Sequence, residues 1–165
     1  MAEPPASRPL TTGERALAAG MFGPAIDYDA VRLHRRKWWP LHPPRVVMAP
    51  DGHIWFHPES PIWRDDFAQA PVAAQGLFIH EMAHVWQAQR RGRWWLPLMR
   101  HPFCRYGYRI RAGWPLDRYG IEQQAEIVRH AFLLRAGCVA PGGATLAQCE
   151  AALPADWALP RDGAA

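Results

Sequence analysis

The sequence predicts a single small α+β domain that is rich in helix. Apolar residues recur at helical spacing in two segments, one from residue 72 to about residue 91 and one from about residue 118 to residue 135. Two short β-prone runs, residues 45–48 and 53–57, flank a Pro-Asp-Gly turn. The chain has 165 residues, of which 49% are hydrophobic and 21% charged, so it can bury one core and does not resemble a disordered protein. We expect one domain over residues 13–153, between flexible tails at residues 1–12 and 154–165.

The N-terminal part should contribute one helix and one hairpin. A helix is expected from Thr11 or Thr12, with the threonine as its N-cap, Glu14 in its first turn and four small or apolar residues before Gly20. The hairpin pairs residues 45–48 with residues 53–57 through the turn at Asp51. Prolines on both sides of the hairpin limit it to a small sheet.

The two strong helices have clear boundaries in the sequence. Pro71 precedes the first and Gly92 follows it, while Asp117 is the expected N-cap of the second and Gly137 lies near its end. Each helix should bury one stripe, formed by Ile79, Met82, Ala83 and Trp86 in the first and by Ile121, Ala125, Val128 and Phe132 in the second. Residues 93–115 are expected to form a long connection with room for a short helix.

Composition narrows the classes of protein to consider. The formal net charge of +4 is a mild excess, so nucleic-acid binding is not favoured on charge alone. No segment has the length of a membrane span and the N-terminus lacks the pattern of a signal peptide, so we expect a cytoplasmic protein, although signal-independent export is compatible with the same sequence. The cysteines, Cys104, Cys138 and Cys149, are expected to be reduced thiols, with a Cys138–Cys149 bridge as the alternative.

A metal-binding motif lies within the first strong helix. His80-Glu81-Met82-Ala83-His84 is an H-E-x-x-H pattern, which places two imidazoles one helical turn apart on the same face. Both can bind one zinc ion, and Glu81 can take a proton from a water that zinc activates. The alternative is an ordinary helix with two solvated or core histidines. We expect this helix to be amphipathic and half buried.

A catalytic zinc usually has a third protein ligand, which the second strong helix can supply. Glu122-Gln-Gln-Ala-Glu126 presents two carboxylates one turn apart. Glu122 can reach the metal while Glu126 accepts a hydrogen bond from the far nitrogen of a ligating histidine, and the reverse assignment is also open. The alternative is that both are surface acids, with Glu126 paired to Arg129.

These two motifs resemble the gluzincin arrangement, in which H-E-x-x-H is completed by a glutamate of an E-x-x-A-[DEN] helix. The flanks Phe78-Ile79 and Val85-Trp86-Gln87-Ala88-Gln89 are similar to the DUF4157-like small metallopeptidases, including bacterial proteins called "vgr-related", a label associated with type VI secretion. The resemblance covers residues from about 45 to about 134. In one position it departs from the pattern, because Glu126 stands where relatives more often have Asp or Asn.

The resemblance implies a minimal zincin-like fold, with a small sheet beside the active-site helix and the glutamate helix packed against it. It further implies one zinc ion held by His80, His84 and Glu122, with Glu81 as general base and Glu126 supporting a ligating histidine. The implied activity is hydrolysis of a peptide or amide bond in a peptide or protein substrate. A secretion-system or effector protein is an implied partner.

Several aromatic and basic residues have two interpretations. The hairpin residues His53, Trp55 and His57 can line a cleft, but a core role for the tryptophan and solvated histidines are preferred. Donors for an oxyanion are His101, Tyr106, Tyr108 and Tyr119, and spacing does not select among them. The clusters at residues 35–39 and 90–95 interleave arginine with tryptophan, which favours arginine covering tryptophan over binding of phosphates or a membrane surface. The apolar run at residues 94–99 is a docking patch, a lid or part of the core.

We therefore predict a zinc metallopeptidase that uses metal-activated water. The alternative is a non-catalytic zinc-binding or secretion-effector-associated interaction module. A third possibility is a nucleic-acid-binding protein with an incidental motif, whose affinity would fall steeply with salt.

Overall fold

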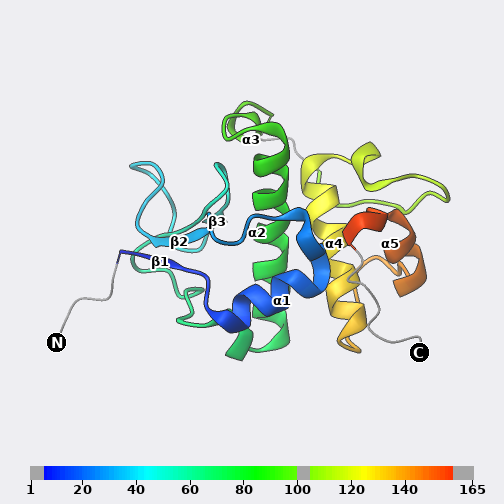
Figure 1. The fold of residues 1–165 in the computed structure, drawn as a ribbon, viewed down its shortest axis with the longest axis horizontal. Coiled ribbons are helices and arrows are strands. Elements are labelled where there is room, and N and C mark those ends of the chain that lie inside the picture. Colours follow the sequence, from blue (N-terminus) through cyan, green and yellow to red (C-terminus); the bar gives the residue numbers. More distant parts are fainter. Residues whose placement is uncertain (1–5, 100–104, 158–165) are drawn as a thin grey trace.

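A computed structural model describes residues 6–99 and 105–157 and shows an α+β fold (Figure 1). Within these ranges a four-stranded sheet lies to one side of the long central helix and the C-terminal helices lie to the other. The strands are β1 (Ser7–Pro9), β2 (Arg32–Arg35), β3 (Val47–Met48) and β4 (Ile54–Phe56), and the α-helices are α1 (Thr12–Phe22), α2 (Val72–Arg91), α3 (Trp95–Met99), α4 (Ile121–Arg135) and α5 (Leu146–Ala152). The predicted fold class, α+β with a small sheet, is confirmed. None of the described helices is long and apolar enough to cross a membrane.

The sheet has the order β1-β2-β4-β3 and mixes two kinds of pairing. β3 and β4 are antiparallel, with Val47 opposite Phe56, so the predicted hairpin is confirmed, although its strands are shorter than expected. β4 also pairs in parallel with β2, which the sequence analysis did not predict. Because β2 is only four residues long and three of them are His or Arg, it lacks the alternating pattern that identifies a strand.

Residues 7–9 belong to the sheet rather than to a flexible tail, which corrects the expectation for that part of residues 1–12. β1 pairs with β2 in antiparallel fashion, and Arg8 forms a bidentate ion pair with Glu14, at 2.8 Å for each nitrogen–oxygen contact. Glu14 is fully buried, and its carboxylate also accepts hydrogen bonds from the backbone of Thr11 and Phe67. A buried carboxylate needs such partners, and one of them is Arg8 of β1. The ion pair between Arg8 and Glu14 therefore holds β1 against the start of α1.

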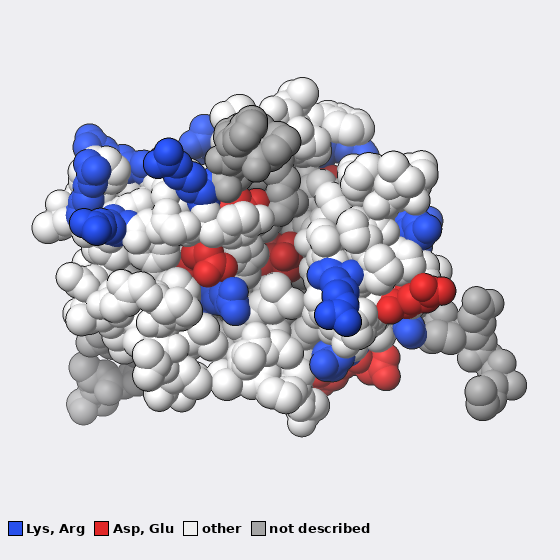
Figure 2. Space-filling view, turned by 180° about the vertical axis from the view of Figure 1, so that it is seen from behind, with Lys and Arg blue, Asp and Glu red and all other residues white. Residues whose placement is uncertain are grey.

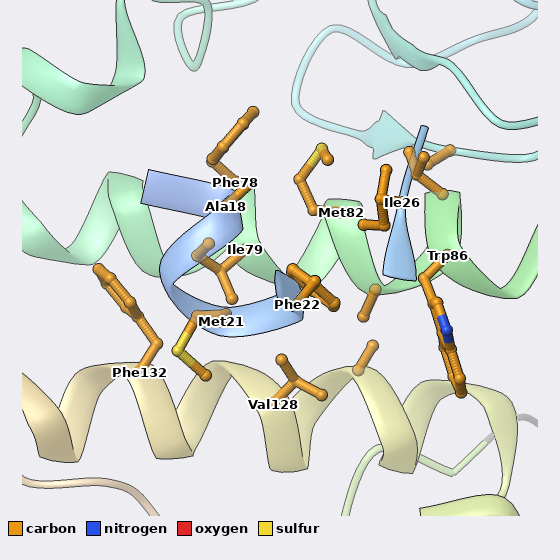
Figure 3. Close-up of a cluster of buried hydrophobic side chains, with 14 of the residues drawn as sticks. Ala18, Met21, Phe22, Ile26, Phe78, Ile79, Met82, Trp86, Val128 and Phe132 are labelled. Carbon is orange, nitrogen blue, oxygen red and sulfur yellow. The ribbon is translucent and has the colours of Figure 1, made fainter. Parts of the chain in front are cut away.

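Helix α1 begins as the sequence predicts. Thr11 is its N-cap, and Thr11 and Glu14 form a reciprocal capping box. The helix continues two residues past Gly20, and Met21 and Phe22 pack into the core against α2 and α4 (Figure 3). The turn that follows depends on Gly23, whose φ of 52° favours glycine, and a Cβ there would lie 2.7 Å from the carbonyl oxygen of Trp157.

Helix α2 has the predicted boundaries and is the centre of the core. The expected stripe of Ile79, Met82, Ala83 and Trp86 is buried. Burial goes further than expected, because all residues from 78 to 88 are buried, so the expectation of a half-buried helix is wrong. The reason is that α4 packs along one side of α2 while the sheet and α1 cover the other (Figures 1 and 3).

Helix α4 begins later than predicted. Gly120 is its N-cap, and its backbone N–H donates to the side chain of Gln123 at 3.0 Å. Asp117, the predicted N-cap, instead lies in the 3₁₀ turn Leu116–Arg118 and pairs with Arg90 at 3.1 Å. The Asp117 carboxylate, which was expected to cap α4, thus pairs with Arg90 of α2 instead.

The connection between α2 and α4 contains the helix α3 and the 3₁₀ turn Leu116–Arg118. The expectation that this connection has room for a short helix is confirmed. His101 and Cys104 lie outside the described residues. Cys138 and Cys149 are both free thiols, so the alternative of a bridge between them is wrong.

Candidate metal centre

Two histidines of α2 meet at one point inside the protein. The Nε2 atoms of His80 and His84 lie 3.2 Å apart, as the i, i+4 spacing predicts, and both side chains are buried. Two imidazole nitrogens that face each other at this distance must share a proton or a cation, because two lone pairs alone repel.

Glu122, from the first turn of α4, completes the group. Its Oε2 lies 3.1 Å from His84 Nε2 and 3.4 Å from His80 Nε2, and the side chain is fully buried. The carboxylate reaches the histidines because α2 and α4 pack closely. At this contact α2 carries Gly76, where a Cβ would lie 3.0 Å from the side chain of Leu133.

The geometry of these three residues fits a zinc ion. Tetrahedral coordination with bonds of about 2.0–2.1 Å separates the ligand atoms by about 3.3 Å. The three separations here are 3.1, 3.2 and 3.4 Å. Two imidazole nitrogens and one carboxylate oxygen are also the donor set of a known class of catalytic zinc sites. His80, His84 and Glu122 are the group among the described residues that could hold a metal ion.

Glutamines orient His84. The Nδ1 atom of His84 lies 2.8 Å from Gln87 Oε1, so this nitrogen carries the proton and Nε2 is free to bind a cation. Gln87 in turn donates from Nε2 to the carbonyl oxygen of Ile121 and to Gln124 Oε1, which ties α2 to the start of α4. This role of Gln87 was not among the predictions from the sequence, although a glutamine three residues after a histidine on a helix is a usable signal.

Glu126 faces the other histidine. Its Oε1 lies 2.7 Å from His80 Nδ1 and its Oε2 lies 3.3 Å from His130 Nε2. It also pairs with Arg129 at 3.3 Å, so the surface ion pair that the sequence offered as an alternative coexists with the contact to the histidine. Burial alone would raise the pKa of Glu126, but His130, His80 and Arg129 outweigh that effect and hold its pKa well below the ordinary range. The carboxylate is therefore ionised.

Negative charge dominates around His80. Burial by itself lowers the pKa of this imidazole, but Glu122, Glu126 and Glu81 favour its charged form and raise the pKa to about 9. The same field attracts any cation that takes the place of the proton. The site is thus built to neutralise positive charge in a buried position.

Glu81 lies beside the first histidine and is almost fully buried, with 4% of its surface exposed. Its Oε2 has no hydrogen-bond partner among the described residues. A buried oxygen without a partner loses free energy unless a ligand or water supplies the hydrogen bond. An acceptor of this kind next to a metal-binding group is suited to take a proton from a water.

The three described tyrosines that could stabilise an oxyanion differ in their surroundings. Tyr108 and Tyr119 are occupied elsewhere, since Tyr108 Oη lies 2.5 Å from His130 Nδ1 and Tyr119 Oη accepts from the backbone of Arg111. Tyr106 is half exposed, and its ring lies almost parallel to that of His80 with centroids 6.5 Å apart. Tyr106 is therefore the tyrosine that the structure brings to the candidate site.

Among the described contacts, none joins the hairpin residues His53, Trp55 and His57 to the metal-binding group. Trp55 is buried and stacks on His34 with centroids 3.9 Å apart, so the preferred core interpretation is confirmed. His57 is buried rather than solvated, because its Nδ1 accepts from the backbone of Glu59.

Arginines of both clusters lie over tryptophan rings, some inside the clusters and some outside them. Arg36 lies over Trp55, Arg91 over Trp95 and Arg93 over Trp94, which confirms that arginine covers tryptophan. The run at residues 94–99 is divided, since Leu96 is buried while Trp94, Leu98 and Met99 are exposed.

The face of the molecule opposite to that of Figure 1 is hollowed near its middle. Figure 2 shows acidic side chains in and beside this hollow, with Lys and Arg side chains gathered at the upper left and others next to the acids, and further acids toward the lower right.

Comparison with known proteins relates the chain to a secretion component. No family model matches it. It is 36% identical to the solved effector domain of Pseudomonas aeruginosa VgrG2b, with a TM-score of 0.70, and the match covers 89% of this chain and 84% of that domain. It is also 43% identical, over 135 residues, to the type VI secretion system spike protein VgrG2b of P. aeruginosa. That match covers 78% of this chain but only 13% of the spike protein.

Proposed function

This chain belongs to the family of the VgrG2b effector domain, and we propose that it is a zinc-dependent metallopeptidase of a type VI secretion effector. The resemblance to vgr-related proteins is thereby confirmed, while the gluzincin assignment and the peptidase activity form the proposal. The observation that carries it is the buried His80, His84 and Glu122 group, whose ligand atoms have the separations of a tetrahedral zinc site, with Glu81 adjacent.

Each residue has a defined part in this proposal. His80, His84 and Glu122 would hold one zinc ion, which when bound would supply a water ligand with a pKa lowered to about 7 and a Lewis acid for a carbonyl oxygen. Glu81 accepts a proton from the attacking water and returns it to the leaving amine. Glu126 and Gln87 fix the orientation of His80 and His84 through their Nδ1 atoms. Tyr106, whose ring lies alongside that of His80, is the proposed hydrogen-bond donor to the oxyanion.

The test separates metal binding from catalysis. We expect about one zinc per chain in the purified wild type, with strong loss in His84→Ala and Glu122→Ala variants that remain folded by circular dichroism. Glu81→Gln should keep both fold and zinc but lose hydrolysis of a fluorogenic peptide library by at least about a hundredfold. Glu59→Gln, an exposed acid outside the site, is the matched control. A folded wild type that takes up no added zinc would refute the proposal.

A non-catalytic zinc-binding interaction module is the second candidate. Trp94, Leu98 and Met99 are exposed beside the arginines of α2, which is a surface suited to a protein partner. In that case wild type and Glu81→Gln would both bind zinc, and neither would hydrolyse any peptide.

A further inference from the structure

The geometry points to a second part of the substrate site, an arginine-lined cavity that binds an acidic side chain of a peptide substrate. This inference rests on the proposed peptidase function and names the class of peptide that the metal centre would receive. Three features carry it: two adjoining cavities, a segment held in place by hydrogen bonds, and three arginines in a cavity whose described lining includes no acid.

The first cavity borders the side of His80 that carries Nδ1. It has a volume of about 630 Å³, and its lining includes Tyr106, which stacks on His80, and Glu126, which contacts His80 Nδ1. The second cavity, of about 440 Å³, shares the wall formed by residues 107–109 with the first. A peptide bound in the first cavity can therefore place a neighbouring side chain in the second.

The shared wall is fixed to helix α4. Gln123 Nε2 donates to the carbonyl oxygen of Gly107 at 2.7 Å, and the backbone N–H of Arg111 donates to Tyr119 Oη at 2.9 Å. Between these two points, Tyr108 Oη contacts His130 at 2.5 Å. Because two backbone hydrogen bonds and one side-chain contact hold this segment, the cavity exists before a ligand arrives, which lowers the entropy cost of binding.

Among the described residues, the lining of the second cavity carries positive charge only. Arg105, Arg109 and Arg111 line it together with uncharged residues, and Arg109 also lines the first cavity, where Glu126 lies. The nearest acid along this segment, Asp117, is paired with Arg90 of α2. Arg111 lies over the ring of Trp114 at 4.4 Å, an arrangement that steadies its guanidinium group. Guanidinium groups pair with carboxylates through two parallel hydrogen bonds, so a glutamate or aspartate side chain is the matching ligand.

A peptide suits this surface better than a nucleic acid does. A strand of nucleic acid that ran through both cavities would bring its phosphates to the Glu126 side chain, an acid in the lining of the first cavity. The ring of Tyr119 is 6% exposed, so it offers no open face for a base. A peptide with one acidic side chain can place that negative charge beside the arginines of the second cavity and keep uncharged groups beside Glu126 in the first.

Binding by the zinc-loaded full chain tests the inference without relying on turnover. Glu81→Gln serves as the background, so that a bound peptide is not hydrolysed. The probes are a fluorescein-labelled short peptide with two adjacent glutamates, the same peptide with glutamines, and a labelled single-stranded oligonucleotide, each titrated by fluorescence anisotropy. Arg109→Gln with Arg111→Gln removes two charges from the cavity, and Arg45→Gln, an exposed arginine outside both cavities, with Arg64→Gln, is the matched control.

We expect the glutamate peptide to bind more tightly than the glutamine peptide, and the Arg109 and Arg111 double variant to weaken it about fivefold. The control pair should leave its affinity unchanged, and the glutamine peptide should not distinguish the variants. Equal affinity for the two peptides, or equal loss in the control pair, would overturn the inference. Tighter binding of the oligonucleotide that is lost in the double variant would also overturn it. Glutamate-selective binding by a wild type that hydrolyses no peptide would instead refute the proposed function and leave the anionic site in place.

Discussion

Replacing Glu126 by glutamine tests whether this residue supports the metal centre. Its Oε1 lies 2.7 Å from His80 Nδ1, whereas glutamine retains one acceptor oxygen but removes the charge. Loss of a carboxylate that supports a ligating histidine typically lowers metal affinity by about 10- to 100-fold, or about 1.4 to 2.7 kcal/mol. Glu126 contacts Nδ1 of His80, the nitrogen that faces away from the metal-binding group. We therefore expect the zinc affinity to fall about thirtyfold in Glu126→Gln.

The assay is competition for zinc against a chromophoric chelator at pH 7. Glu150→Gln is the matched control, because it removes an acid that is paired with Arg135 at 2.8 Å on the exposed surface. That variant should bind zinc as the wild type does, and circular dichroism should show both variants folded. Wild-type zinc affinity in folded Glu126→Gln would refute the reasoning and leave the ion pair with Arg129 as the role of Glu126.

Three further predictions concern stability. When free zinc is about a thousandfold above Kd, removing it with a chelator should lower the thermal midpoint of the wild type by roughly 10 °C. The thermal midpoint of Glu122→Gln should not change, and equal shifts in the two proteins would contradict the zinc site. Glu14→Gln should reduce the free energy of unfolding by about 3 kcal/mol in urea, because it removes the buried charge that pairs with the partly buried Arg8 guanidinium. A loss below about 0.5 kcal/mol would show that the pair contributes little. Burial and the nearby His53 lower the pKa of His34 to about 4 in the folded protein, below its ordinary value of 6.5. The unfolded chain therefore binds more protons between these values, and stability should fall as the pH drops from about 6.5 to about 4; His34→Gln should reduce the loss at pH 5 by about 1 kcal/mol, and an unchanged pH profile would contradict this.

Local patterns predicted the long helices because their signals do not depend on distant parts of the chain. The boundaries of α2 follow from Pro71 and Gly92, and the capping box of α1 follows from Thr11 and Glu14. The start of α4 was misplaced because the side chain of Asp117 pairs with Arg90 across the fold, a partner that sequence neighbours do not reveal. Strands β1 and β2 were missed for a related reason, since each is defined by its pairing with the other and neither has a periodic pattern of its own.

The sequence by itself determined the two halves of the candidate site, because helical spacing places His80 with His84 and Glu122 with Glu126 on shared faces. Only the tertiary structure decided which carboxylate meets both histidines, since that depends on how closely α4 approaches α2 and at what register. Packing puts Glu122 against the two Nε2 atoms and turns Glu126 to the opposite nitrogen of His80. It also decided what surrounds the site: the burial of Glu81 and the arginine-lined cavity behind Tyr108. His84 and Glu122 are 38 positions apart, and a contact over that separation arises from folding rather than from any local pattern.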